Sequence, residues 1–216
     1  MTYIITSKVG SDVANAVRRQ FGDESGVQVK DADFLRWIND GQRSIVAKNK
    51  VLKGKATLAA TPGQADYDMP AARIANIESI HINNIPIPGL SYPDMEKYIE
   101  DHPYLTADAT GTPVLWYQWG GLITLWPTPT QADMISLLYT AFPPELTSLS
   151  EALSLPDKYF NVLIDYVLSK AYELDEEFDA SSFKSQQYEN QLHEMADEER
   201  STANMTYPVI NDVVDY

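Results

Sequence analysis

The hydrophobic residues of this chain change their period twice, and this change is the strongest constraint on its fold. Up to about Lys48, and again from about Asp157, apolar residues recur every three or four positions, which is typical of helices. Between Lys55 and Phe142 the chain has short apolar runs separated by proline, glycine and asparagine, which is typical of strands and turns. We therefore predict an α+β fold: a helical bundle built from both ends of the chain, with an inserted antiparallel β-region.

The predicted organisation has four parts. Helices are expected over residues 11–20, 31–48, 157–175 and 182–200. Ser11 is expected to cap the first helix and Gly22 to end it, since these residue types favour those positions. The parts are the N-terminal bundle helices (1–54), the β-region with a short helix (55–142), a connector with the C-terminal bundle helices (143–200), and an extended C-terminal arm (201–216).

The clearest signal in the β-region is a pair of aromatic, branched runs, 114–119 and 122–126, joined by Gly120-Gly121. A two-residue loop of this composition predicts a hairpin that pairs Trp119 with Leu122. Both faces of this hairpin are largely apolar, which indicates burial on both sides. Two interpretations stay open: burial inside one chain, or contact with a neighbouring subunit. The candidate contact residues are Trp116, Trp119, Leu122 and Trp126.

Weaker signals complete the β-region. Thr61-Pro62-Gly63 predicts a hairpin or a tight corner between two strands. Asn83-Asn84 predicts a hairpin between strands over 74–82 and 85–90, and the prolines of the second run confine it to a sheet edge. Further elements are expected as a short helix over 92–99 capped by Ser91 and a strand over 134–141.

Charge and composition exclude several classes of protein. The formal charge is −15, but residues 1–55 hold 10 basic and 6 acidic groups, so the acidity belongs to the rest of the chain. Such a chain is a poor general binder of DNA. It has no cysteine, no signal-peptide pattern at its N-terminus and no apolar run near the roughly 18 residues of a membrane span, so we expect synthesis in the cytoplasm and no contact with a membrane.

No pattern indicates catalysis or a cofactor. The chain has three histidines, and the pair Glu189 and His193 is spaced by four and occurs once, whereas di-metal helix bundles use a spacing of three, twice. Phosphate-binding loops and nucleophile elbows are absent from the sequence. We predict a protein that is not an enzyme and needs no cofactor; a carboxylate metal enzyme is the least favoured alternative.

The aromatic hairpin also allows a ligand-binding interpretation, since exposed aromatic rings on a sheet can stack on bases or sugars. A nucleic-acid platform would need interleaved basic residues, and between Arg73 and Lys158 the sequence has Lys97 alone. A non-catalytic carbohydrate-binding accessory module is therefore the main alternative to a structural protein.

Taken in order, several fragments resemble the head-to-tail adaptor (connector) proteins of tailed bacteriophages, most closely those of short-tailed phages. Each fragment alone is weak, but their order and spacing are specific. The fragments are residues 33–40 (DFLRWIND), 61–70 (TPGQADYDMP), 111–113 (GTP), 125–129 (LWPTP), 138–146 (LYTAFPPEL), 155–159 (LPDKY) and 164–174 (IDYVLSKAYEL).

This resemblance implies a structural protein of the virion neck. It implies a homo-oligomeric ring of twelve subunits below the portal protein, joined to a downstream tail or nozzle protein, through which genomic DNA passes without specific binding. Closing a ring requires two unlike, complementary surfaces on each subunit. The basic segment 1–55 is then the candidate for contact with the portal.

Two further sets of residues follow from the ring hypothesis. Acidic side chains of the C-terminal helices are expected to line the channel and keep DNA from adhering; the candidates are Glu176, Glu177, Glu189, Glu194 and Glu198. The C-terminal arm either docks on another subunit as an added strand or is disordered. Its contact candidates are Tyr207, Val209 and Ile210.

Overall fold

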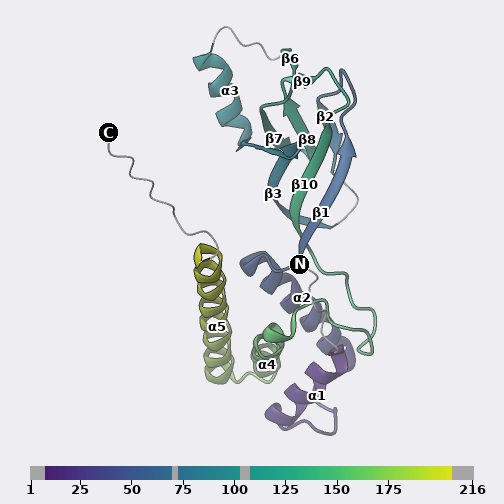
Figure 1. Cartoon of the computed structure of the whole chain (residues 1–216). Coiled ribbons are helices and arrows are strands. Elements are labelled where there is room, and N and C mark those ends of the chain that lie inside the picture. The colour runs from purple at the N-terminus through teal and green to yellow at the C-terminus, as the bar shows by residue number, and fades with distance from the viewer. Residues whose placement is uncertain (1–7, 70–72, 103–107, 206–216) are drawn as a thin grey trace, which may run out of the picture. The chain divides into compact units, whose positions relative to one another are not determined.

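The computed structural model describes residues 8–69, 73–102 and 108–205, and side chains as far as Glu199. The chain forms two compact units (Figure 1). One unit contains the chain up to Val51 and from Pro143 onward, and the other is Leu52–Phe142. The fold is α+β as predicted, with a helical unit discontinuous in sequence and a β-unit inserted into it.

The helical unit is organised around one helix. Its helices are α1 (Gly10–Phe21), α2 (Asp31–Asn49), α4 (Phe160–Leu174) after a 3-10 turn (Asp157–Tyr159), and α5 (Phe178–Met205). Helix α4 contacts each of the other three. Its buried side chains lie at three- and four-residue spacing, so they cover more than one face and allow this central position. They include Val162, Leu163, Val167, Leu168 and Ala171.

The first helix begins differently from the prediction. Ser11 lies inside α1, and the capping position is Val9, whose N–H donates to the Asp12 carboxylate at 3.0 Å. Asp12 is therefore the residue that satisfies the backbone at this end, because a carboxylate at the third helical position can reach back to the cap. The other end is as predicted: Gly22 adopts φ +89° and ends the helix.

The turn between α1 and α2 is built around one carboxylate. Asp23 is buried and accepts hydrogen bonds from the N–H groups of Val27, Gln28 and Val29 at 2.9, 3.1 and 2.9 Å. The hydrogen bond from Val29 is the main cause of a lowered pKa of Asp23, and burial opposes it. The charged carboxylate thus organises the backbone that leads into α2.

The β-unit is a sandwich with a helix on one outer face. The first sheet has the order β1-β10-β3-β4 and the second β2-β8-β7-β5. The strands are β1 (Lys53–Ala59), β2 (Asp66–Asp68), β3 (Ile74–Ile82), β4 (Ile85–Ile87), β5 (Gly89–Leu90), β7 (Leu115–Trp119), β8 (Leu122–Trp126) and β10 (Met134–Ala141). A separate pair, β6 (Thr110–Gly111) and β9 (Thr128–Pro129), is parallel.

Both predicted hairpin turns are present, but the strand predicted over 85–90 is divided. Strand β4 ends at Ile87, and β5 belongs to the second sheet, where it pairs parallel with β7. Pro88, which has no N–H to donate, lies between the two strands. Asn83 and Asn84 adopt positive φ values of 48° and 69° between β3 and β4, and β4, which carries Pro86, lies at a sheet edge. The glycine-linked hairpin has the predicted register, with Trp119 opposite Leu122. Thr61-Pro62-Gly63 forms the corner, because β1 and β2 belong to different sheets.

Aliphatic and aromatic side chains from both sheets form the sandwich core. Helix α3 (Tyr92–Asp101), capped by Ser91, forms a second apolar cluster with the hairpin. The core residues are Ala60, Tyr67, Ile80, Ile82, Ile123, Leu125, Ile135 and Leu137. The hairpin therefore separates two apolar layers of one unit.

We expect Asp23→Asn to reduce the acid sensitivity of the protein. Because the folded pKa of Asp23 is below its ordinary value of 3.8, its contribution to stability is complete above that pH and is lost as the pH falls through the folded pKa. Urea unfolding between about pH 5 and pH 2 measures this effect. Glu24→Gln changes an exposed neighbour and serves as the control. Equal loss of stability in wild type and Asp23→Asn would contradict the role of Asp23.

We expect Gly41→Ala to destabilise the helical unit. A Cβ at this position of α2 would lie 2.6 Å from Cδ1 of Leu163 and 2.7 Å from Cδ1 of Tyr166, both on α4. The steric cost of about 1–3 kcal/mol exceeds the gain of about 1 kcal/mol from replacing glycine in a helix. Chemical denaturation followed by circular dichroism measures it. Ala47→Gly, at an exposed position of α2, is the control, because it measures the difference in helix propensity between alanine and glycine without a packing change. A Gly41→Ala variant more stable than the wild type would contradict close packing of α2 on α4 at this position.

Candidate assembly surfaces

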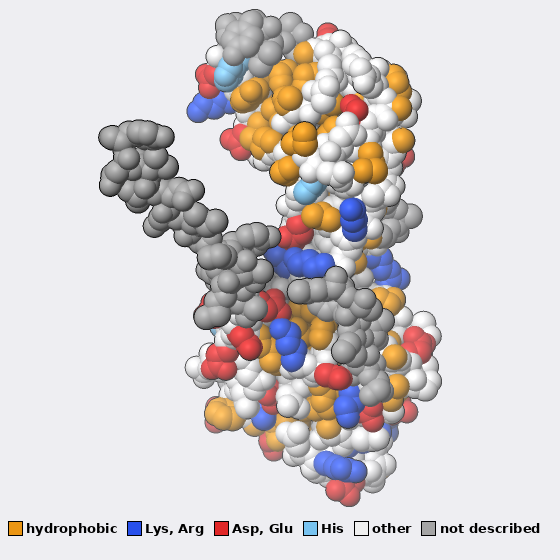
Figure 2. All heavy atoms as spheres, viewed as in Figure 1, with side chains coloured by type: hydrophobic (Ala, Val, Ile, Leu, Met, Phe, Trp, Pro, Cys, Tyr) orange, Lys and Arg blue, Asp and Glu red, His pale blue; other side chains and the backbone are white. Residues whose placement is uncertain are grey.

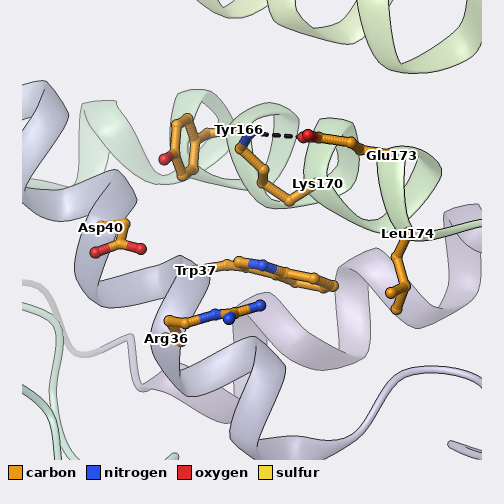
Figure 3. Close-up of a pocket in the computed structure, with 7 residues that line it drawn as sticks. All are labelled: Arg36, Trp37, Asp40, Tyr166, Lys170, Glu173 and Leu174. Carbon is orange, nitrogen blue, oxygen red and sulfur yellow. Dashed lines mark hydrogen bonds and ion pairs between the residues drawn. The ribbon is translucent and has the colours of Figure 1, made fainter. Parts of the chain in front are cut away.

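A groove lies between α2 and α4 of the helical unit (Figure 3). Its volume is about 460 Å³. Trp37 is only 6% exposed and forms its floor, and Tyr166 and Leu174 add apolar surface from α4. Tryptophan and tyrosine in a recess are the residue types that most often anchor a protein–protein contact.

Charged side chains of both signs surround this floor. Arg36 and Asp40 come from α2, and Lys170 and Glu173 come from α4, where they form an ion pair at 2.6 Å. The Arg36 guanidinium lies 6.0 Å from the centre of the Trp37 ring. Exposed ion pairs of this kind contribute little to stability. An apolar floor with a polar rim is the usual anatomy of a protein-binding surface.

Helix α5 is attached to α2 by specific polar contacts. The Tyr188 hydroxyl donates to Ser44 at 2.7 Å, and the Asn49 amide donates to the Leu192 carbonyl at 3.1 Å. Burial raises the pKa of Tyr188 to about 12, and the neutral hydroxyl is the donor in this hydrogen bond. Helix α5 also packs on α4, where the buried Asp165 accepts hydrogen bonds from Lys184 and Gln191, both at 2.9 Å. The contacts to α2 and α4 together determine which face of α5 is covered.

The opposite face of α5 carries an exposed stripe. Phe183, Asn190, Glu194 and Asp197 are all exposed and are spaced by seven, four and three residues, so they lie along one side of the helix. Phe183 is 66% exposed, which places it among the most exposed large apolar side chains of the described chain. The stripe therefore combines one apolar side chain with acidic and amide groups.

The predicted channel residues do not form one cluster. Glu176 and Glu177 lie in the corner between α4 and α5, whereas Glu198 lies near the other end of α5, about 30 Å away along the helix. Glu189 pairs with Lys48 of α2, which neutralises its charge locally. Glu194 and Glu198 are exposed on α5. The acidic groups thus follow the length of α5.

The predicted hairpin contacts divide into buried and exposed residues. Trp126 is 5% exposed and packs with Leu115 and Met95 of α3, so it lies in the core of this unit. Trp116 packs partly buried against the sandwich core, and Leu122 is partly exposed. Trp119 is 62% exposed at the hairpin end, with its ring 4.7 Å from that of Tyr92. The available part of this surface is therefore small and centred on Trp119.

The remaining candidates are dispersed. His81, His102 and His193 lie on β3, at the end of α3 and on α5, and among the described residues no group of three or more His, Cys, Asp or Glu side chains could hold a metal ion. Helix α5 runs to Met205, so the prediction of an extended arm from residue 201 is wrong for residues 201–205, which are helical. Tyr207, Val209 and Ile210 lie outside the described residues.

Many basic groups of segment 1–55 are paired within the chain. Lys48 pairs with Glu189, Lys53 with Glu78 and Arg43 with Glu145, all carboxylates from beyond that segment. These pairs reduce the positive field that the segment alone would produce. Figure 2 shows both signs of charge on the visible face of the helical unit, and mostly apolar or uncharged side chains on that of the β-unit.

The groove, the α5 stripe and Trp119 are surfaces of a kind that suits contacts with other proteins. Residues 1–209 match the SU10 adaptor protein family, and this chain belongs to that family. It is a family of head-to-tail adaptors of the short-tailed phage type, which confirms the resemblance found in the sequence and implies a place in the virion. No curated protein matches the chain. Among the described helices, none is sufficiently long and apolar to cross a membrane.

The groove between α2 and α4 was not predictable from the sequence. Trp37 was recognisable as an aromatic residue beside the apolar stripe of the second helix, but nothing in sequence indicated that Tyr166 and Leu174 would lie across from it. In the sequence, Phe183 is an apolar residue among polar ones. Its exposure becomes clear only from the structure, in which the opposite face of α5 is the one that packs against the helical unit.

We expect two tryptophans of the hairpin to respond differently to truncation. Trp126→Ala should lower the free energy of unfolding by about 3–5 kcal/mol, because it removes a buried ring. Trp119→Ala should change it by less than about 1 kcal/mol, because the ring is mostly exposed. Chemical denaturation of the two purified variants provides the comparison, and similar losses in both would contradict this assignment of core and surface.

Proposed function

We propose that this chain assembles with copies of itself into a closed ring at the neck of the virion, between the portal and the next tail component. Membership of the adaptor family supports the structural role, and the family resemblance implies twelve copies. In this proposal genomic DNA passes through the ring, and the subunits perform no chemistry. The hairpin gives little support to a carbohydrate platform, since Trp126 is buried and Trp116 packs against the core.

The observation that carries the ring proposal is the presence of two unlike surfaces on different helices of one unit. The groove between α2 and α4 has an aromatic floor, and the α5 stripe presents Phe183. A head-to-tail contact that repeats around a circle needs one surface of each kind on every subunit. We propose that Phe183 of one subunit enters the groove of the next and packs on Trp37.

The charges around these surfaces are compatible with this pairing. The groove rim contributes two cations, Arg36 and Lys170, which already approach Asp33 at 3.4 Å and Glu173 at 2.6 Å within the subunit. The α5 stripe contributes Glu194 and Asp197, which would share these cations across the contact. Opposite charges across an interface contribute mainly to orientation and to the rate of association. A buried aromatic anchor would supply most of the binding energy.

The acidic groups along α5 suit a channel that does not retain DNA. Glu194 and Glu198 are exposed on this helix, and Glu176 and Glu177 lie exposed at its beginning. Because DNA carries a negative charge about every 1.7 Å, a bore lined with carboxylates would repel it. Glu189 is the weakest candidate for this role, because Lys48 compensates its charge.

The test of the ring contact is Phe183→Asp. A carboxylate cannot enter an aromatic groove without a desolvation cost, so we expect the variant to stay monomeric under conditions in which the wild type forms rings, with portal protein present as a template. Light scattering and negative-stain images report assembly, and circular dichroism checks folding.

Val27→Asp is the matched control, since Val27 is 65% exposed on the same unit, and it should assemble normally. Normal ring formation by Phe183→Asp would overturn the proposed contact. Failure of the wild type to form any ring with portal protein would overturn the proposed function itself.

A further inference from the structure

Strand β1 is an open edge of its sheet. The order β1-β10-β3-β4 places β1 at one end, with a neighbour on one side only. It has seven residues, whereas the opposite edge strand β4 has three and contains Pro86. In the second sheet, the edge strands β2 and β5 have three and two residues. Among the described strands, β1 is therefore the long edge without proline, and such an edge is a template for another strand.

The hydrogen bonds at both ends of β1 show which backbone groups face outward. The N–H of Ala141 donates to the carbonyl of Leu52, and the N–H of Ala60 donates to the carbonyl of Asp133. In an antiparallel pair, every second residue of a strand forms backbone hydrogen bonds to the neighbouring strand. Because Leu52 and Ala60 bond toward β10, the even-numbered residues between them do so as well. The odd-numbered residues therefore point their N–H and C=O groups away from the sheet, and these are Lys53, Lys55, Thr57 and Ala59.

An apolar hollow lies beside this edge. It is lined by Thr57, Leu58 and Ala59 of β1 together with Ala132 and Met134. Met134 is 43% exposed. Peptides that add a strand to a sheet obtain affinity from backbone hydrogen bonds and specificity from such recesses, which receive alternate side chains. The edge and the hollow together form a site for an extended, apolar segment.

We infer that β1 binds residues 209–215 of a second copy of this chain as an added strand. This segment, VINDVVD, has the seven residues needed to match β1, contains no proline or glycine, and has four β-branched residues. Val or Ile side chains of the segment would fill the hollow. This inference deepens the proposed ring and rests on it, because the second copy is the neighbour within the ring.

Charge favours the same occupant. The segment contains Asp212 and Asp215, and the exposed side of β1 carries Lys53 and Lys55. Lys53 already approaches Glu78 at 3.2 Å, whereas Lys55 is exposed and available to a carboxylate of the added strand. Opposite charges on neighbouring strands stabilise the pairing modestly and help to fix its register.

The absence of cysteine from the full sequence allows a direct test by disulfide cross-linking. Thr57→Cys is combined in one full-length chain with Asn211→Cys, Asp212→Cys or Val213→Cys, rings are assembled with portal protein, and the rings are imaged before oxidation. We expect at least one pair to give a ladder of covalently linked chains on a non-reducing gel, since paired strands bring Cα atoms within disulfide range. Ile85→Cys, on the opposite edge of the same sheet, replaces Thr57→Cys in the control and should give no ladder.

Two results of this experiment would overturn the inference. Imaged rings that yield no linked chains would show that the segment does not reach β1. A disulfide formed only within single chains would show that the segment docks on its own subunit.

A second measurement is independent of ring formation. A synthetic peptide of residues 206–216 is added to the monomeric full-length chain, and hydrogen exchange of the amides of Lys53, Lys55, Thr57 and Ala59 is followed. We expect the peptide to slow their exchange. Thr57→Pro removes an outward N–H and should weaken peptide binding at least about tenfold, whereas Thr57→Val keeps the donor and should bind normally.

These results separate the inference from the proposed function. Peptide protection of these amides in a chain that forms no ring would retain the β1 site and reject the ring. Unchanged exchange at all four amides with excess peptide would reject the β1 site, whatever the state of assembly. Equal peptide binding by Thr57→Pro and wild type would also reject it.

Discussion

The antiparallel pairing of β1 with β10 is the constraint on which the rest of the structure depends. These are the first and last strands of the inserted unit, and they pair along the whole of β1, from Lys53 opposite Thr140 to Ala59 opposite Met134. The N–H of Ala141 donates to the carbonyl of Leu52, so the chain enters and leaves the β-unit at adjacent points. The helical unit can therefore form from two distant segments at a small cost in loop-closure entropy, because the insertion brings their ends together.

The helical unit uses polar contacts to align its two segments. The Asn39 side chain of α2 donates to the carbonyl of Leu146 at 3.0 Å and accepts from its N–H at 2.8 Å. The buried Gln42 accepts from the N–H of Ser154 at 2.9 Å. The Nε2 of Gln42 has no hydrogen-bond partner among the described residues, so only its oxygen is used. Hydrogen bonds between buried polar groups add little net stability but disfavour other arrangements, since losing them would leave more buried groups without a partner. These contacts therefore fix the connector against α2.

The sequence predicted those features that depend on local chemistry. The register of the aromatic hairpin followed from Gly120-Gly121, because a two-residue loop leaves a single pairing. The prediction that Ser11 caps α1 was wrong. The helix begins at Gly10, with Val9 at the capping position, and the Asp12 carboxylate accepts the hydrogen bond from the N–H of Val9. The corner at Thr61-Pro62-Gly63 had two local solutions, and the pairing of β1 with the distant β10 selects one.

The candidate surfaces were less predictable, because they combine residues distant in sequence. The groove requires α2 and α4 to cross at Gly41, where the missing side chain admits Leu163 and Tyr166. The burial of each hairpin tryptophan depends on the position of α3. This helix packs over Trp126 and leaves Trp119 mostly exposed. Exposure of Phe183 likewise depends on which face of α5 packs on α2 and α4, through Tyr188 and through the hydrogen bonds to Asp165. The hydrophobic period of the sequence predicts which element each residue belongs to, but it does not predict which residues of other elements lie next to it.

The two proposed contacts differ in kind, and this difference bears on how a strongly acidic subunit can assemble. At −15 per chain, copies repel each other, so a single small contact would close a ring poorly. A side-chain contact at the α2–α4 groove and a backbone contact at β1 lie on separate units of each subunit. Once either has formed, the other becomes an intramolecular event at high effective concentration. Two individually weak contacts can then hold a ring that neither would hold alone, and a template that brings copies together would initiate both.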